Sequence, residues 1–91
     1  MRWLHHADTE KPPIVRREPL EDGWVDESAP VLAWVSDLRA WMVLVYEQDD
    51  TGAEYWEPED RDGRAYRVTW WTELPPDPGK AADWRRPWNE Q

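Results

Sequence analysis

Acidic side chains gather in one stretch of this 91-residue chain, residues 47–62. The stretch carries a local charge of −7, out of a net charge of −9, because Arg61 is the one cation in it. Its carboxylates are Glu47, Asp49, Asp50, Glu54, Glu57, Glu59, Asp60 and Asp62. Nucleic acids and anionic membranes attract cations, so they should repel this surface. A basic protein surface is the partner that such a charge attracts.

The spacing of these carboxylates sharpens that expectation. On a strand-like backbone, residues two apart lie roughly 6.5–7 Å from each other on one face. Glu57 with Glu59, and Asp60 with Asp62, would then present regularly spaced negative charge, as phosphates do. We expect this array to occupy the basic channel of a protein that handles nucleic acid, with fast and salt-sensitive association and no direct binding to nucleic acid.

Aromatic residues offer anchors for such an interface. The chain has nine tryptophans, three tyrosines and no phenylalanine, so most of these rings must fill the core. A tryptophan that stays at the surface is a strong interface anchor because it removes a large apolar area from water. Trp56 lies inside the acidic stretch and Trp71 follows it. We predict that both join the eight carboxylates in binding the partner.

Other chemistries find little support in the residue pattern. His5 and His6 precede Asp8 and Glu10 without the rigid spacing of a metal site. Ser28 lacks a nearby histidine or a nucleophile motif, and the four glycines form no phosphate loop. The chain has no cysteine. We therefore expect no catalytic residue, no metal, no cofactor and no enzyme activity.

The chain length fits one small domain. Residues 1–22 alternate charge and proline without a sustained period, which predicts an extended or mobile N-terminal segment before a single domain at 23–91. No secretory leader and no apolar run of membrane-spanning length is visible. We expect a soluble cytoplasmic protein that binds no membrane.

Residues 30–46 allow two readings. A helical face would consist of Val31, Trp34, Val35, Leu38, Trp41, Met42 and Val45, with Ser28 as a possible N-cap. Against that, the run from Trp41 to Tyr46 is apolar and β-rich, which suits a buried strand. The residues before this strand would form either a hairpin that turns at residues 36–39 or a helix that ends near Ala40. Both alternatives stay open from the sequence.

The signals after Tyr46 favour strands. The turn residues at 49–52 predict a hairpin that returns through residues 53–57. Residues 64–72 alternate as a further strand, with Tyr66, Val68 and Trp70 on one face and Trp71 on the other. We predict that Trp70 faces the core and that Trp71 is partly exposed.

The prolines after Leu74 prevent a regular strand, so the tail should cross the sheet as an extended strap anchored by Trp84 and Trp88. The predicted fold is mostly β, a small antiparallel meander with a C-terminal strap rich in proline and tryptophan. An α+β fold with one short helix is the alternative.

The segment 68–78, VTWWTELPPDP, resembles the closing signature of a family of small phage and prophage proteins, family 551 of the domains of unknown function, which ends roughly in VTHWMPLPEPP. VLVY at 43–46 and WVS at 34–36 are similar to that family's strand and to its opening Trp-Ile-Ser. The resemblance covers about residues 34–78. It implies an origin in a phage or another mobile element, and no biochemical activity.

Two further resemblances use the same stretch. Residues 62–72, followed by Pro78-Gly79 and Trp84, look like the NGK-Y-AKWWT-PG-W pattern of small chitin- and cellulose-binding modules, whose exposed aromatic rings stack on sugars. The spacing from Trp71 to Asp77 and the ending Ala82-Asp83-Trp84 are similar to phage Thoeris anti-defence proteins, which sequester nucleotide signals.

Together these features lead to one expected function and two alternatives. We expect a non-enzymatic phage protein that inhibits a host defence machine in the host cytoplasm, as anti-CRISPR proteins do, by binding a basic protein through its acidic, aromatic-flanked surface. The first alternative is a carbohydrate-binding module with Tyr66, Trp70 and Trp71 as its platform. The second is a phage structural or housekeeping protein whose acidity confers solubility.

Overall fold

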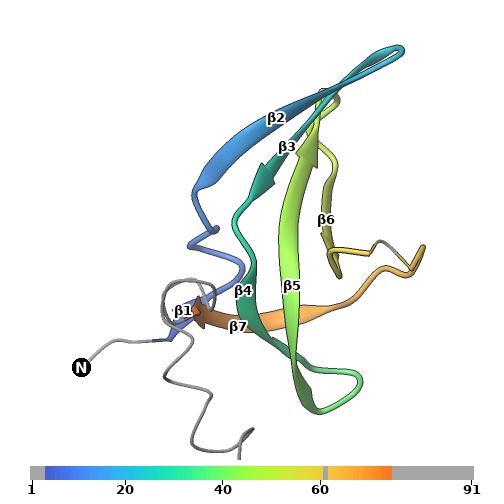
Figure 1. The fold of residues 1–91 in the computed structure, drawn as a ribbon. Helices are drawn as coiled ribbons and strands as arrows, with labels where there is room; N and C mark the ends of the chain where they lie inside the picture. Colours follow the sequence, from blue (N-terminus) through green and yellow to red (C-terminus); the bar gives the residue numbers. More distant parts are fainter. Residues whose placement is uncertain (1–3, 61, 75–91) are drawn as a thin grey trace, which may run out of the picture.

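A computed structural model describes residues 4–60 and 62–74 of the chain, and this part forms seven β-strands and no helix. All strand pairs are antiparallel, so the predicted mostly β fold is confirmed and the short helix of the alternative is not formed here. Figure 1 shows the strands, which are β1 (His5–His6), β2 (Ile14–Leu20), β3 (Gly23–Ser28), β4 (Val31–Val35), β5 (Ala40–Asp49), β6 (Glu54–Glu57) and β7 (Val68–Glu73).

Strand β5 organises the sheet because it is long enough to pair with different strands at its two ends. Strands β4 and β3 follow one side of β5, with a break in the pairing at residues 29–30 (Figure 1). Strand β6 pairs with the other side of β5, near the end of β5 that also pairs with β3. Strand β2 pairs with β3, while β7 pairs with β4 and β1 with β7. One end of the sheet is therefore β2-β3-β5-β6, and the other is β1-β7-β4-β5.

The alternatives for residues 30–46 resolve in favour of the hairpin. Buried Val31, Ala33 and Val35 alternate with less buried Leu32 and Trp34, which is the period of a strand. The turn between β4 and β5 includes Arg39 with a φ of 54°, in the left-handed region. The helical face read from the sequence is therefore wrong, because the β-branched run pairs across the sheet.

The predicted hairpin of β5 and β6 is confirmed. The carboxylate of Asp49 closes its turn by accepting hydrogen bonds from the backbone N–H groups of Thr51 and Ala53, at 2.9 and 3.0 Å. Gly52 has a φ of 91°, which a glycine adopts without strain. The turn thereby fixes which residues of β5 and β6 face each other.

One face of the sheet forms the core. Tyr46 and Trp56 are register partners whose rings lie 5.1 Å apart, and Trp71 donates its indole N–H to the carbonyl oxygen of Glu10 at 2.7 Å. The indole therefore keeps a hydrogen bond in an apolar setting. The buried cluster consists of Ala7, Val31, Ala33, Val35, Leu44, Tyr46, Trp56, Val68 and Trp71.

The predicted register of β7 is wrong, because a β-bulge interrupts its alternation. Trp34 pairs with Trp70 and Val35 pairs with Val68, so Thr69 is an extra residue on β7. The bulge places Val68 and Trp71 on the core face although they are three residues apart. Trp71 is 3% exposed and Trp70 is 37% exposed, the reverse of the prediction. The strand also begins at Val68 and not at Arg64.

The first 22 residues, expected to be extended or mobile, contribute two strands to the sheet. Strand β2 forms a hairpin with β3 across residues 21–22, and β1 pairs with β7. The strap predicted around Trp84 and Trp88 lies outside the described residues. None of the described residues belongs to a helix with the length and apolar character that crossing a membrane requires.

Candidate binding face

The face of the sheet opposite the core changes its chemistry along β5. Alternate residues of β5 point to this face, in the order Trp41, Val43, Val45, Glu47 and Asp49. The face is therefore aromatic and aliphatic where β5 pairs with β4, and carboxylate-rich where β5 pairs with β3 and β6. Each end presents a group of side chains that the core does not use.

Four aromatic side chains lie in a row across the end of the face where β5 pairs with β4. Strands β1, β7, β4 and β5 contribute one each. Successive members are register partners, in the order His6, Trp70, Trp34 and Trp41. The rings of His6 and Trp70 lie 4.7 Å apart at 71°, and those of Trp34 and Trp41 lie 5.3 Å apart at 64°. These edge-on contacts suit aromatic quadrupoles. We call this group the aromatic row; Trp41 within it is 42% exposed.

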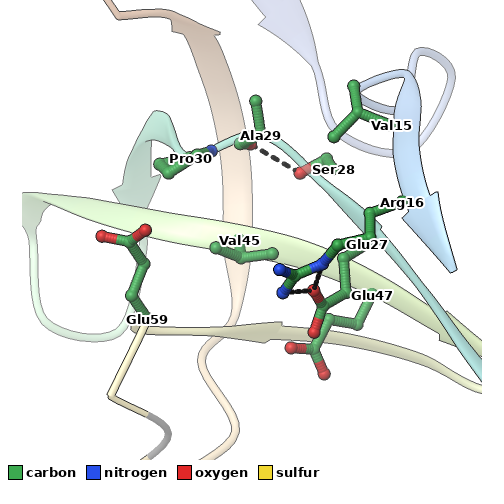
Figure 2. A pocket seen from close by; sticks show the side chains of 9 residues that line it. All are labelled: Val15, Arg16, Glu27, Ser28, Ala29, Pro30, Val45, Glu47 and Glu59. Atoms are coloured by element: carbon green, nitrogen blue, oxygen red, sulfur yellow. Dashed lines mark hydrogen bonds and ion pairs between the residues drawn. The ribbon is translucent and has the colours of Figure 1, made fainter. Parts of the chain in front are cut away.

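A cleft of about 320 Å³ opens at the other end of the face, where β5 pairs with β3 and β6. Figure 2 shows Val45 between Glu59 on one side and Arg16, Glu27 and Glu47 on the other. We call this the acidic cleft. It is lined by Val15, Arg16, Glu27, Ser28, Ala29, Pro30, Val45, Glu47 and Glu59.

Glu27 is held in the cleft as an ion pair. Its side chain is buried, and its Oε1 accepts hydrogen bonds from Nε of Arg16, at 2.9 Å, and from Nη2 of the same guanidinium. Arg16 and Glu27 are register partners of β2 and β3, so the backbone pairing itself brings them together. A buried carboxylate needs this neutralisation, because burial removes the water that would stabilise its charge.

Glu47 lies beside this ion pair as the register partner of Glu27. The pKa of Glu47 is raised to about 7, most strongly by burial and then by the negative charge of Glu57, a hydrogen bond with Glu57 and the charge of Glu18. Glu18, Glu27, Glu47 and Glu57 come from β2, β3, β5 and β6, so each of the four strands adds one carboxylate. With this pKa, the charge of Glu47 changes near neutral pH.

A carboxyl with a pKa near 7 beside other carboxylates could act in acid–base chemistry. Among the described residues that line the cleft, Ser28 alone has a hydroxyl, and the fold already uses it. Its Oγ accepts the backbone N–H of Tyr46 at 3.0 Å and donates to the carbonyl oxygen of Ala29 at 2.7 Å. The described lining therefore offers carboxylates and one guanidinium as its charged groups.

The predicted site residues do not form one continuous acidic array. Strand β6 ends at Glu57, so Glu59 and Asp60 lie in the following turn without strand spacing. Glu54 pairs with Lys11 at 3.1 Å. Asp62 accepts hydrogen bonds from the Tyr66 hydroxyl and the Arg64 backbone, at 2.7 and 3.0 Å. Of the predicted carboxylates, Glu47 and Glu59 line the cleft, with Glu57 hydrogen-bonded to Glu47.

Four predicted site residues have roles inside the fold. Trp56 and Trp71 are buried in the core, so the prediction that they anchor a partner is wrong. Glu47 is 5% exposed, within the cleft and not on an open belt. Asp49 closes the turn, and the hydrogen bonds from Thr51 hold the pKa of its carboxyl below its usual range. Asp50 is exposed in the same turn.

The sequence interpretation missed the contributors from the N-terminal half, Arg16, Glu18 and Glu27, and the row members Trp34 and Trp41. A signal for Arg16 and Glu27 exists in the sequence. Basic residues 16–17 and acidic residues 26–27 flank a turn at 21–22, and they pair as Arg16 with Glu27 and Arg17 with Asp26. Opposite charges on either side of a turn favour such a hairpin.

The histidine segment packs against the sheet. His5 stacks on Trp71, with ring centroids 4.3 Å apart, and its Nε2 lies 3.2 Å from Glu73. His6 belongs to the aromatic row. Within residues 4–60 and 62–74, the structure places no three histidine or acidic side chains where they could hold a metal ion together.

Comparison of the chain with models of protein families, with curated proteins and with solved structures finds no match. The geometry of the face opposite the core therefore carries the functional interpretation, and the resemblances read from residues 34–78 stay predictions.

Proposed function

We propose that this protein is a non-enzymatic binding protein that engages a basic, nucleic-acid-handling protein through the face opposite its core. One observation carries the proposal: Glu27 and Glu47 line the acidic cleft, Glu18 and Glu57 of two further strands lie close enough to act on Glu47, and the aromatic row continues the same face. Negative charge would steer a basic partner to this face, and the exposed rings would hold it once water is excluded.

The electrostatics of Glu47 support this proposal. Burial and the negative charges of Glu57 and Glu18 raise the pKa of Glu47, which means that they disfavour its ionised form. A cationic group that enters the cleft would relieve both effects. Groups that disfavour folding are commonly kept where binding needs them.

The resemblance to small phage proteins supports a narrower proposal. In this version the partner is a complex of host defence, of the kind that anti-CRISPR proteins inhibit, and the acidic face occupies the channel that would hold nucleic acid. The protein would then act in the host cytoplasm.

A charge-neutralisation series tests the proposal. The variant Glu57→Gln, Glu59→Gln, Asp60→Asn removes three negative charges in and beside the acidic cleft. The control Asp8→Asn, Glu21→Gln, Asp37→Asn removes three from exposed turn residues elsewhere. Association rates with purified CRISPR and other nucleic-acid-binding defence complexes are measured at several salt concentrations. We expect the first variant to slow association by on the order of tenfold at low salt, and the control by about twofold or less. Equal effects of the two variants would contradict the proposal.

The aromatic row favours one second candidate, a carbohydrate-binding module. Two of the residues predicted for such a platform do not suit it, because Trp71 is buried and Tyr66 packs against the core. Trp70, Trp34 and Trp41 would replace them. Stacking on sugars depends little on ionic strength, so retention on chitin or cellulose in high salt, lost in a Trp41→Ala variant, would favour this candidate over the first.

A further inference from the structure

We infer that the aromatic row and the acidic cleft form one docking groove, and that its occupant is an arginine-containing segment of the basic partner. The inference rests on the proposed function and narrows it from a basic surface to a side-chain type. Three observations carry it: the continuity of the two groups along β5, the chemistry that they combine, and an example of the same combination inside the chain.

Continuity comes from the alternation of β5. Trp41, Val43, Val45 and Glu47 follow one another on the same face, over about 20 Å at the usual rise of a strand. Val43 is 45% exposed, and Val45 lines the cleft itself. An extended segment that lies along β5 would therefore contact indole, then aliphatic groups, then carboxylates.

The combination of indoles and carboxylates fits a guanidinium better than an ammonium group. A guanidinium is flat and weakly hydrated, so it can stack on an indole face at one end of the groove, and at the other end its N–H groups can form a fork to a carboxylate. A lysine ammonium is compact and strongly hydrated. It can pair with the carboxylates but gains less from the rings.

The chain already holds one arginine in this way. On the core-side face of the β2–β3 hairpin, the guanidinium carbon of Arg17 lies 4.4 Å from the centroid of the Trp24 ring. Nε of the same group donates to Asp26 at 2.7 Å. In the groove these contacts would be divided between two arginines of the partner segment, one stacked on the indole of Trp41 and one paired with the carboxylates of the cleft, because Trp41 and Glu47 lie about 20 Å apart along β5.

The geometry disfavours other occupants. Phosphates of a nucleic acid would face the carboxylates of the cleft and be repelled. A polysaccharide would use the rings alone, and their planes meet at 64° and 71° where a flat platform would have them coplanar. An arginine-containing segment is the occupant that uses both ends of the groove.

The test compares two peptides of equal length and charge, nona-arginine and nona-lysine, by calorimetry with the full chain at low salt. We expect nona-arginine to bind about tenfold more tightly, because cation–π contact and forked hydrogen bonds add to the shared charge attraction. Trp41→Leu should remove most of this preference, by weakening nona-arginine about tenfold and nona-lysine by about twofold or less. Trp24→Leu, the same substitution on the other face, should preserve the preference.

Each outcome has a distinct meaning. Equal binding of both peptides to the wild-type protein would overturn the inference and leave the proposed function standing. The absence of binding to either peptide would overturn both. Equal weakening of the two peptides by Trp41→Leu would also overturn the inference. The wild-type comparison needs no variant, so a Trp41→Leu protein that fails to fold leaves the test decisive.

Discussion

The two ends of the face opposite the core differ in the kind of side chain that each exposes or buries. In the aromatic row, large rings that water solvates poorly remain exposed, to 37% at Trp70 and 42% at Trp41. In the acidic cleft, carboxylates that water solvates well are almost fully covered, to 3% exposure at Glu27 and 5% at Glu47. Folding alone favours the reverse at both ends.

The difference indicates which part of the molecule is arranged for something other than folding. The core face follows the ordinary rule, with valines, Leu44, Trp56 and Trp71 buried together. The opposite face departs from the rule at each end, and the departures lie next to each other on β5. Departures of this kind concentrate at binding sites, because a partner completes them.

The largest expected effect is on stability, and it distinguishes Trp71 in the core from its neighbour Trp70 in the aromatic row. Trp71→Ala should lower the free energy of unfolding by about 3–5 kcal/mol, since it empties a packed site and removes the hydrogen bond to Glu10. Trp70→Ala should cost about 1 kcal/mol, because its ring is already partly in water. Thermal and urea unfolding of both variants measures this order. The opposite order would mean that β7 has the uninterrupted alternation of the sequence prediction.

That reversal shows which part of the fold the sequence can predict. Hairpins with local signals were predictable, as at the turn of residues 49–52, because the turn residues and the strands they join are neighbours in the chain. The bulge at Thr69 was not, since it exists only through the pairing of β7 with β4. A single extra residue there exchanged the roles of Trp70 and Trp71.

The candidate site was predictable in the same partial way. Acidity and aromatic content are composition, so the expected class of partner needed no structure. The burial of Glu47 depends on β3 on one side and β6 on the other, and these strands come from different parts of the chain. The sequence therefore indicated the charge of the face but not that its central carboxyl is enclosed.

A pH titration of stability tests the acidic cleft alone. The pKa of Glu47 is raised from 4.5 to about 7 in the folded protein, so the folded state holds its proton more tightly than the unfolded chain does. The contribution of Glu47 is therefore most favourable below pH 4.5 and is lost as the pH rises to about 7. We expect that loss to lower the free energy of unfolding by about 1–3 kcal/mol.

Glu47→Gln isolates this contribution, because glutamine keeps the size of the side chain and cannot ionise. The difference in unfolding free energy between wild type and Glu47→Gln should change by about 1–3 kcal/mol between pH 5 and 8, with the variant relatively more stable at the higher pH. Glu21→Gln, at an exposed turn position, should show no such change. Parallel pH profiles for wild type and Glu47→Gln would show that the cleft does not hold Glu47 as the structure describes.

The smallest expected effect concerns the aromatic row. Trp34 and Trp41 are register partners with rings 5.3 Å apart, so each should stabilise the fold partly through the other. A double-mutant cycle with Trp34→Ala and Trp41→Ala should give a coupling energy of about 0.5–1.5 kcal/mol. The pair Trp24 and Trp41, on opposite faces, should give a coupling near zero. If the Trp34–Trp41 coupling were also near zero, these rings would not act as a unit in the fold. The exposed indoles would then be independent contacts, and only the acidic cleft would remain as a feature of this face that is built from several strands.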